Sequence, residues 1–349
     1  MPGMDLEPGT CGIARRIALP FADTSSQATV ARQADGFSLG PWTSGDSASG
    51  VRGLLIGPDG EERRSFAAEG SSNNVHWPLF LGAVPIALDV YVGAQATPGG
   101  DERFELRGWA DGDPVAQSHG TLLLAYWRGT DAVRVLPALD GQRAVFAIWP
   151  SGISEPRAAV IGPDGARIGE AHSLGAAGRR FSTCENLTPT EHGGLISFVD
   201  IDEQALHLIE LGPDGEPVFD VSRKWSGSNL PCPLLAPDDA GFTILAPSTD
   251  EGQPSTLYRL DHGGTITEAP ILLTARLIAI GSSAQGTLLL QQRDRELLLT
   301  QIGPAGSREF PLGSTPNSLV SVPSEPGRIF VDAQSLEAGV RELLELTCQ

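Results

Sequence analysis

The sequence predicts an all-β protein, a seven-bladed β-propeller of four-stranded antiparallel blades. Three observations lead to this fold class. A glycine-rich turn returns at a near-constant interval, each interval holds short apolar runs of strand length, and the two ends of the chain supply complementary parts of one further blade.

The recurring turn is Gly-Pro-Asp-Gly, which occurs at residues 57–60, 162–165 and 212–215. Degenerate copies follow the same kind of apolar run at 109–112, 261–264 and 303–306. Proline presets φ at the first corner of such a turn, aspartate tolerates the second corner, and glycine takes the positive φ that ends it. The final glycines lie 42 to 53 residues apart, which is a period typical of a repeat architecture.

Each period holds four candidate strands. In one repeat, residues 195–199 and 205–211 are apolar runs joined by a polar connection, and residues 216–219 follow the turn. A shorter run ending in proline or glycine precedes them, here at 185–189. Short β-branched and aromatic runs between regular turns are typical of an antiparallel meander, so each repeat is interpreted as one four-stranded blade.

The two ends of the chain complete the ring. Residues 341–346 resemble a third strand without its fourth, and residues 12–19 resemble a fourth strand without its third. Pairing them gives a seventh blade and removes a free sheet edge. Cys11 and Cys348 flank the missing turn, so we expect a disulfide there. Cys184 and Cys232 occupy equivalent positions in neighbouring repeats and form a second predicted pair; the alternative is four buried thiols.

Residues 235–247, continuing to 256–261, resemble the repeat of TolB-type propellers. That repeat has a Pro-Asp-x-x-Gly hairpin, here Pro237 to Gly241, and then an apolar strand and a second strand with tyrosine that ends at an aspartate. The other repeats keep only the hairpin, and the serine usual before Pro-Asp is absent. The resemblance implies a fold and no particular activity.

Composition narrows the partners and the compartment. The chain has 349 residues and a net charge of −19, which disfavours binding to nucleic acid or to an anionic membrane surface. No apolar run approaches the roughly 18 residues of a membrane span. Residues 1–10 are expected to be disordered or vector-derived, and 11–349 to form a single domain. Residues 1–10 do not have the pattern of a signal peptide, so the protein is expected either to be cytoplasmic or to have lost a leader. Paired cysteines favour export to the periplasm, the cell surface or the exterior.

Catalytic and metal-binding motifs are missing from the sequence. The six histidines are scattered, and acidic groups such as 200–203, 238–239 and 250–251 lack the spacing of a calcium loop. We interpret them as solvated loops, and we predict no catalytic residue, no metal and no cofactor.

One face carries a more informative pattern. Connections from the fourth strand of a blade to the first strand of the next emerge on the same face of a propeller, and three of them combine basic and aromatic residues. Arginine pairs with carboxylate or phosphate, and tryptophan packs against sugars or partner side chains. The alternative is that the tryptophans cap their blades and the arginines neutralise nearby carboxylates. The predicted binding residues are Trp127, Arg128, Arg179, Arg180, Lys224, Trp225 and Arg276.

These features favour a non-enzymatic binding or assembly module that recognises a protein or an anionic saccharide on that face. A second hypothesis is an exported polysaccharide hydrolase or lyase, with Glu185 and Asp131 as acid and base. A third is a passive structural component. An enclosed pocket with a shifted carboxylate would favour the enzyme, and an open face with exposed tryptophan the binding module.

Overall fold

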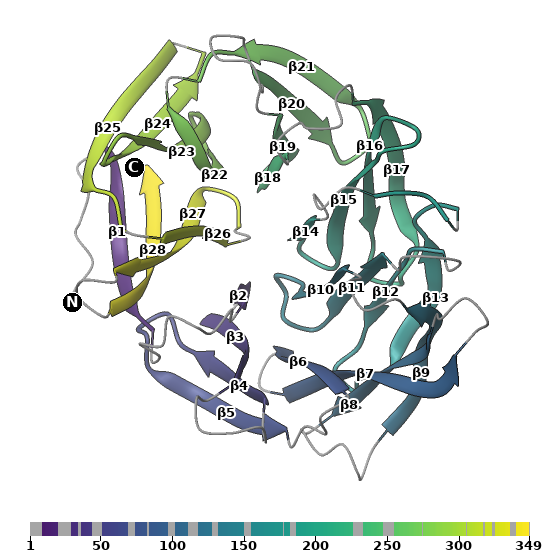
Figure 1. Cartoon of the computed structure of the whole chain (residues 1–349). Helices are drawn as coiled ribbons and strands as arrows, with labels where there is room; N and C mark the ends of the chain where they lie inside the picture. The colour runs from purple at the N-terminus through teal and green to yellow at the C-terminus, as the bar shows by residue number, and fades with distance from the viewer. Residues whose placement is uncertain are drawn as a thin grey trace. The chain divides into compact units, whose positions relative to one another are not determined.

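The computed structural model shows propeller-type blades throughout the part of the chain that it describes (Figure 1). The described residues are 9–19, 29–33, 36–43, 51–68, 74–81, 84–96, 102–110, 118–127, 132–149, 155–176, 178–181, 186–225, 233–246, 255–273, 275–304, 306–316, 318–322, 325–335 and 340–348. Their strands form four-stranded antiparallel sheets, as the spacing of turns predicts. None of these residues forms a helix long and apolar enough to cross a membrane.

The blades belong to two compact units. The central unit, Ser26–Ser228, holds four sheets. The first is β2 (Thr29–Gln33), β3 (Gly36–Thr43), β4 (Val51–Ile56) and β5 (Glu62–Ala68). The second is β6 (Asn74–Leu81), β7 (Val84–Ala96), β8 (Glu102–Ala110) and β9 (Ser118–Trp127). The third is β10 (Ala132–Pro137), β11 (Ala144–Trp149), β12 (Arg157–Ile161) and β13 (Arg167–Ser173). The fourth is β14 (Asn186–Pro189), β15 (Gly194–Asp200), β16 (Ala205–Leu211) and β17 (Pro217–Lys224).

The terminal unit, Met1–Ser25 with Asn229–Gln349, holds three sheets. One is β18 (Leu234–Asp238), β19 (Gly241–Ala246), β20 (Ser255–Asp261) and β21 (Ile266–Ile271). The next is β22 (Arg276–Ser283), β23 (Gly286–Arg293), β24 (Glu296–Gly303) and β25 (Gly306–Ser314). The last joins both chain ends, in the order β1 (Cys11–Ala18), β28 (Val340–Cys348), β27 (Arg328–Ser335) and β26 (Ser318–Val322).

The expectation of one closed seven-bladed ring is corrected by this division. The described strands make seven four-stranded sheets, but four lie in one compact unit and three in the other, and neither unit is a ring of seven blades. The repeat in the sequence determines the blade, which is a local object, whereas closure depends on how blades pack over long distances. The assignment of 11–349 to a single domain stays a prediction, and residues 1–8 lie outside the described part.

The recurring turn has the geometry that its residues predict. In residues 212–215 the amide of Gly215 donates to the carbonyl of Gly212 at 3.1 Å, and Gly215 has a φ of 84°. The Oδ1 atom of Asp214 accepts from the amide of Glu216 at 3.2 Å. The turns ending at Gly60, Gly165 and Gly264 repeat the hydrogen bond and the positive φ. Such a type I turn with a terminal glycine sets the register of the hairpin that follows.

Within each unit, neighbouring blades are held together by apolar side chains from their inner strands. In the central unit, Val145 and Trp149 of one sheet share a buried cluster with Ile196 and Phe198 of the next. In the terminal unit, Leu288 and other leucines of β23 and β24 pack with residues of β27 and β28. β11 and β15 are buried along their whole length, which is typical of strands covered on both faces.

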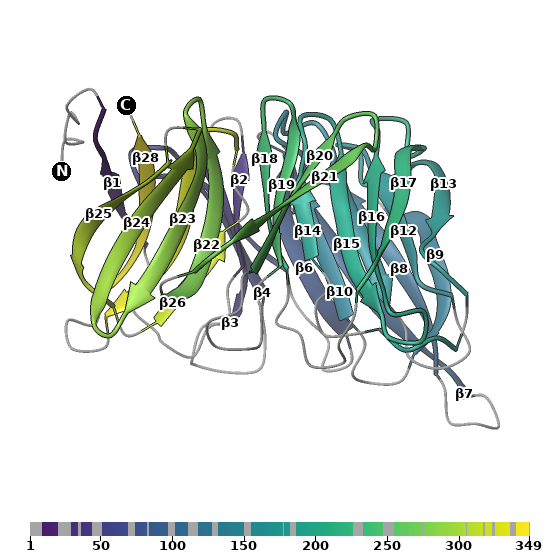
Figure 2. The same cartoon turned by 90° about the horizontal axis from the view of Figure 1, so that it is seen from above.

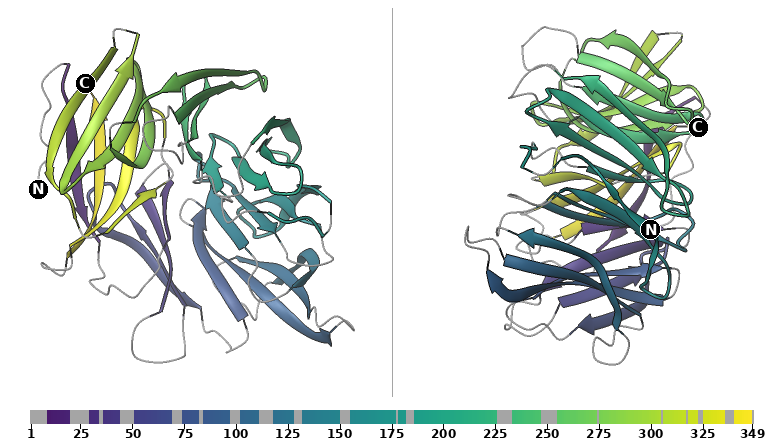
Figure 3. Two further views of the ribbon diagram at one scale, coloured as in Figure 1. Left: turned by 45° about the horizontal axis from the view of Figure 1, so that its top comes forward. Right: turned by 90° about the vertical axis from the view of Figure 1, so that its right-hand side faces the viewer.

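The chain ends meet in one sheet, which confirms the predicted pairing. β1 pairs antiparallel with β28, with Cys11 opposite Cys348, and the two cysteines form a disulfide. Figures 2 and 3 show β1, coloured purple, in the sheet of β28, coloured yellow. Charges reinforce the pairing, because the buried carboxylate of Glu345 lies 3.4 Å from Arg15 of β1 and 2.9 Å from Arg328 of β27. The pair Cys184 and Cys232 lies outside the described residues.

We expect reduction of the Cys11–Cys348 disulfide to lower the free energy of unfolding by roughly 2–4 kcal/mol, since the cross-link removes entropy from the unfolded chain. Urea denaturation with and without reductant measures the change. The variant Cys11→Ser/Cys348→Ser lacks the disulfide, so its free energy of unfolding should be lower than that of the oxidised wild type by the same amount. Reductant should cause no further loss from this position. An unchanged midpoint on reduction, or four free thiols in the unfolded non-reduced protein, would contradict the assignment.

Candidate functional site

The structure describes some of the predicted binding residues and not others. Trp127 ends β9, but its side chain is not described, and Arg128 lies outside the described residues, as do Glu185 and Asp131 of the enzyme hypothesis. Arg276 begins β22 in the terminal unit and is exposed. Arg179, Arg180, Lys224 and Trp225 belong to the central unit, where they can be compared directly.

The segment of Arg179, Arg180 and Phe181 lies against the connection between β15 and β16. Phe181 forms an isolated antiparallel bridge with Asp200, the last residue of β15. The amide of Ile201 donates to the carbonyl of Arg180 at 2.9 Å. Two arginines that precede this blade in sequence are thereby fixed beside its own loop.

Asp200 is the centre of this arrangement, because its side chain is buried and yet fully engaged. Its Oδ1 atom accepts from the amides of Asp202 and Glu203, both at 2.9 Å. Its Oδ2 atom accepts from Nη1 of Arg179 at 2.8 Å. A carboxylate that is 1% exposed must have such partners, since an unpaired buried charge is strongly destabilising. We call Arg179, Arg180, Asp200, Asp202 and Glu203 the Asp200 cluster.

The guanidinium of Arg179 is paired with two carboxylates of this cluster. Its Nη1 atom also contacts the carboxylate of Glu203, and the hydrogen bonds that Arg179 donates, first to Asp200 and then to Glu203, raise its pKa above the usual value. The guanidinium is therefore a structural partner of the loop. The prediction that Arg179 is a free cation for a ligand is corrected; the alternative, that it neutralises neighbouring carboxylates, describes it better.

Arg180 pairs with Asp202 at the surface. Its Nε and Nη2 atoms lie 2.8 and 2.6 Å from Oδ1 of Asp202, and its amide donates to Oδ2 at 2.9 Å. The backbone hydrogen bond from Arg180 is the main reason that the pKa of Asp202 is lowered, followed by the side-chain hydrogen bond. The side chain of Arg180 is 72% exposed, so this guanidinium remains accessible to solvent.

Three rings, those of Phe181, Phe198 and His207, pack against one another next to the β15–β16 connection. Phe181 meets Phe198 edge to face at 5.5 Å between ring centroids, and His207 stacks on Phe198 at 4.8 Å. Phe198 is wholly buried, so this stack connects the arginine segment to the blade core. Such pairs add stability beyond the area that they bury.

The end of β17 lies on the other side of the same loop. Lys224 pairs with Ala205 in register, and the amide of Trp225 donates to the carbonyl of Gln204 at 2.6 Å. Arg223 and Lys224 are exposed, and among the described residues neither has an ion-pair partner. Trp225 is only 5% exposed, so the expectation of an exposed indole there is wrong. It is buried at the end of its blade, where the pairing of β17 with β16 stops.

The cluster has one resemblance to a metal site. Ligand atoms of Asp200, Glu203 and His207 lie within 4.8 Å of one another. Arg179, however, contacts both carboxylates, and both oxygens of Asp200 already accept hydrogen bonds. A permanent guanidinium thus stands beside the carboxylates that would bind a metal, and we assign none to the cluster.

Three carboxyl groups have a pKa that is shifted in the same direction. Asp59, Asp202 and Asp261 each have a lowered pKa, chiefly because backbone amides donate to the carboxylate. Glycosidic acid catalysis requires the opposite shift, in which burial raises the pKa of a carboxyl group.

Comparison with known proteins shows weak structural likeness alone. No family model matches the chain, and no curated protein is similar to it in sequence. A subtype N10 neuraminidase-like protein of A/little yellow-shouldered bat matches with a TM-score of 0.48 at 12% identity, over 97% of this chain and 98% of that one. The WD40 domain of Toxoplasma gondii coronin gives 0.45 at 10%, over 100% and 89%. Hydrazine synthase of Kuenenia stuttgartiensis gives 0.45 at 11%, over 92% and 96%.

These TM-scores are below 0.5, so none of the likenesses supports a statement about function. The resemblance to TolB-type propellers stays a prediction. What the structure itself shows is the β-propeller blade, repeated in both units.

We expect Asp200→Asn to lower the free energy of unfolding by about 2–4 kcal/mol, because the buried carboxylate loses its charge and one of its accepting oxygens becomes an NH2 group that faces a donor. The control Asp202→Asn removes a carboxylate from the exposed pair and should cost clearly less, because exposed ion pairs contribute little to stability. Urea denaturation of both variants makes the comparison. Equal losses would show that Asp200 is not the centre of the cluster.

The pKa of Asp202 should rise part of the way to its ordinary value in Arg180→Ala, since the side-chain donor is lost while the backbone amide remains. A lowered folded-state pKa stabilises the protein above the unfolded value of about 3.9, and this contribution disappears as pH falls through the folded pKa. Carboxyl-carbon NMR titration measures the shift. An unchanged titration curve would show that the side chain of Arg180 does not act on Asp202 in solution.

Proposed function

We propose that this protein is a non-enzymatic binding or assembly module that recognises an acidic protein surface or an anionic saccharide. The proposed site is the rim of the fourth blade of the central unit, made of Arg180, Arg223 and Lys224 around the loop from Asp200 to Gln204. Arg179 and Trp225 hold this rim in place. Trp127, Arg128 and Arg276 stay predicted contributors.

One observation supports this proposal above the others. Arg223 and Lys224 project from the end of β17, exposed and without an ion-pair partner among the described residues. In a chain of 24 basic and 43 acidic residues, adjacent unpaired cations are unusual. They are therefore available to a partner without first breaking an internal contact.

The exposed pair of Arg180 and Asp202 adds a third, exchangeable cation. Surface pairs of this kind contribute little to stability, so an incoming carboxylate can compete for the guanidinium at small cost. Arg179 differs, because it is tied to the buried Asp200. The proposal thus separates cations that bind from the cation that supports the loop.

The compartment of this activity is proposed to be outside the cytoplasm. The Cys11–Cys348 disulfide favours an oxidising environment, where such bonds form and persist. Export to the periplasm, the cell surface or the exterior fits this chemistry, and a cytoplasmic location is the alternative.

We expect Arg223→Glu/Lys224→Glu to abolish capture of acidic polymers while leaving the fold intact, because both side chains are exposed. Surface plasmon resonance on immobilised poly-L-glutamate and on polygalacturonate, at roughly 50 mM salt, measures the binding. The wild-type signal should fall at least about tenfold in the variant, and it should also weaken as salt rises.

The control Arg259→Glu/Arg295→Glu changes net charge equally at exposed arginines of the terminal unit. It should bind as the wild type does. A control that loses as much binding as the rim variant would reduce the effect to overall charge. A wild-type protein that captures neither polymer would leave the passive structural role as the better description.

A further inference from the structure

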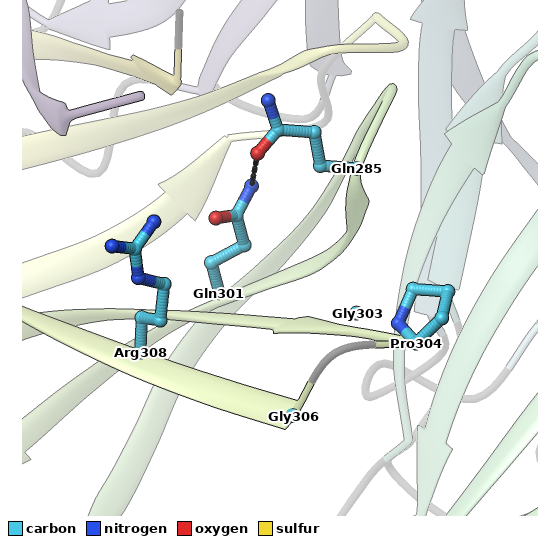
Figure 4. A pocket seen from close by; sticks show the side chains of 6 residues that line it. All are labelled: Gln285, Gln301, Gly303, Pro304, Gly306 and Arg308. Carbon is cyan, nitrogen blue, oxygen red and sulfur yellow. Dashed lines mark hydrogen bonds between the residues drawn. The ribbon is translucent and has the colours of Figure 1, made fainter. Parts of the chain in front are cut away.

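A cavity of about 370 Å³ lies in the terminal unit, within the blade of β22 to β25. Its walls come from two neighbouring turns and the strands beside them, and Figure 4 shows the side chains that face it. Gln285 is contributed by the β22–β23 turn, Gln301 by β24, Arg308 by β25, and Gly303, Pro304 and Gly306 by the β24–β25 turn. A cavity of this volume accommodates one monosaccharide-sized molecule.

Gly303 makes the cavity possible by letting the two turns approach. A Cβ atom at this position would lie 2.3 Å from the backbone carbonyl oxygen of Gln285, which is closer than real contacts allow. Glycine at 303 therefore permits the β24–β25 turn to close against the β22–β23 turn. The backbones of the two turns therefore approach each other closely beside the cavity.

Gln301 presents an unused acceptor in this cavity. The residue is 5% exposed, and its Nε2 atom donates to Oε1 of Gln285 at 3.3 Å and to Oγ of Ser283 at 3.4 Å. Both bonds are long for N–H···O contacts, so they are weak. No described residue donates to Oε1 of Gln301, and Figure 4 shows this oxygen turned away from Gln285. The acceptor is therefore available to a ligand hydroxyl.

Arg308 supplies the complementary charge. It is directly opposite Gln301 in the β24–β25 register, so both side chains lie on the same face of the sheet. Arg308 is exposed and has no ion-pair partner among the described residues. The acid next to it, Glu309, lies on the other face and is bound by Arg293 at 2.8 Å. The guanidinium is thus free to hold a carboxylate in a two-point contact.

We propose that this cavity binds a small hydroxy-carboxylate of the sugar-acid class. The carboxylate pairs with Arg308, a hydroxyl donates to Oε1 of Gln301, and the exposed amide of Gln285 bonds a second hydroxyl. The Pro304 ring offers an apolar wall to the C–H face of the sugar. A bare phosphate fits less well, because it has no C–H face to pack against the Pro304 ring.

The inference does not depend on the cationic rim of the central unit. The two sites share no residue and lie in different units. Loss of one binding activity in a variant therefore leaves the other as an independent measurement.

The test is isothermal titration calorimetry of the whole protein with D-glucuronate, with D-glucose, acetate and inorganic phosphate as comparison ligands. We expect glucuronate to bind with a Kd on the order of 1 mM, as suits a ligand of this size. Arg308→Ala should weaken it at least about tenfold, since the carboxylate loses its partner. Arg295→Ala removes an exposed arginine at the opposite end of the same blade and should leave the affinity unchanged.

Four outcomes would overturn the proposal. These are no heat of binding to the wild type, glucose binding equal to glucuronate, acetate or phosphate binding equal to glucuronate, and an equal loss in both arginine variants. Thermal unfolding verifies that both variants fold. Because both replaced side chains are exposed, neither substitution is expected to disturb the blade.

Discussion

The hydrogen-bonded turn between the third and fourth strands of a blade determines where the charged groups at the far end of the fourth strand lie. In the blade of β14 to β17, Gly215 closes the turn, and the pairing that starts there places Lys224 opposite Ala205. A slip of one residue would exchange the faces to which Arg223 and Lys224 point and change which residue of β16 each one lies opposite. The turn sequence therefore positions the rim of the site, although it lies a whole strand away from it.

Asp200 connects the fold to the electrostatics of that rim. Its burial at the end of β15 demands a positive partner, and Arg179 meets the demand together with two loop amides. The pairing holds the segment from Arg179 to Phe181 on the blade, which in turn brings Arg180 to the surface at the β15–β16 connection, beside Asp202. Of two adjacent arginines in the sequence, one is thus a structural counter-ion and the other an exposed group available to solvent and partners.

The sequence contains the local part of this structure and little of the long-range part. Turns and strand lengths can be predicted from the sequence, because glycine, proline and aspartate determine the backbone conformation of a turn within a few residues. The positions of Cys11 and Cys348 likewise indicate the pairing of β1 with β28. Arg179 and Asp200 are 21 residues apart in the sequence, and their ion pair forms beside the isolated β-bridge between Phe181 and Asp200. No local sequence pattern predicts this contact. The sequence also does not show that Trp225, directly after β17, is buried. The sequence does not predict the cavity at Gln301 and Arg308, because an amide and an arginine seven residues apart form no recognisable motif. The two residues come together only through the pairing of β24 with β25.

The sheet that unites both termini has a consequence for the order in which the protein is made. The central unit is continuous in sequence, so a ribosome releases all its strands before the terminal unit has more than its first one. β1 leaves the exit tunnel before the central unit does and finds its partner β28 only after that unit has been made. Until then it is a solitary strand with open hydrogen-bonding edges, and Arg15 and Arg16 place two positive charges where a neighbouring nascent chain would otherwise add on.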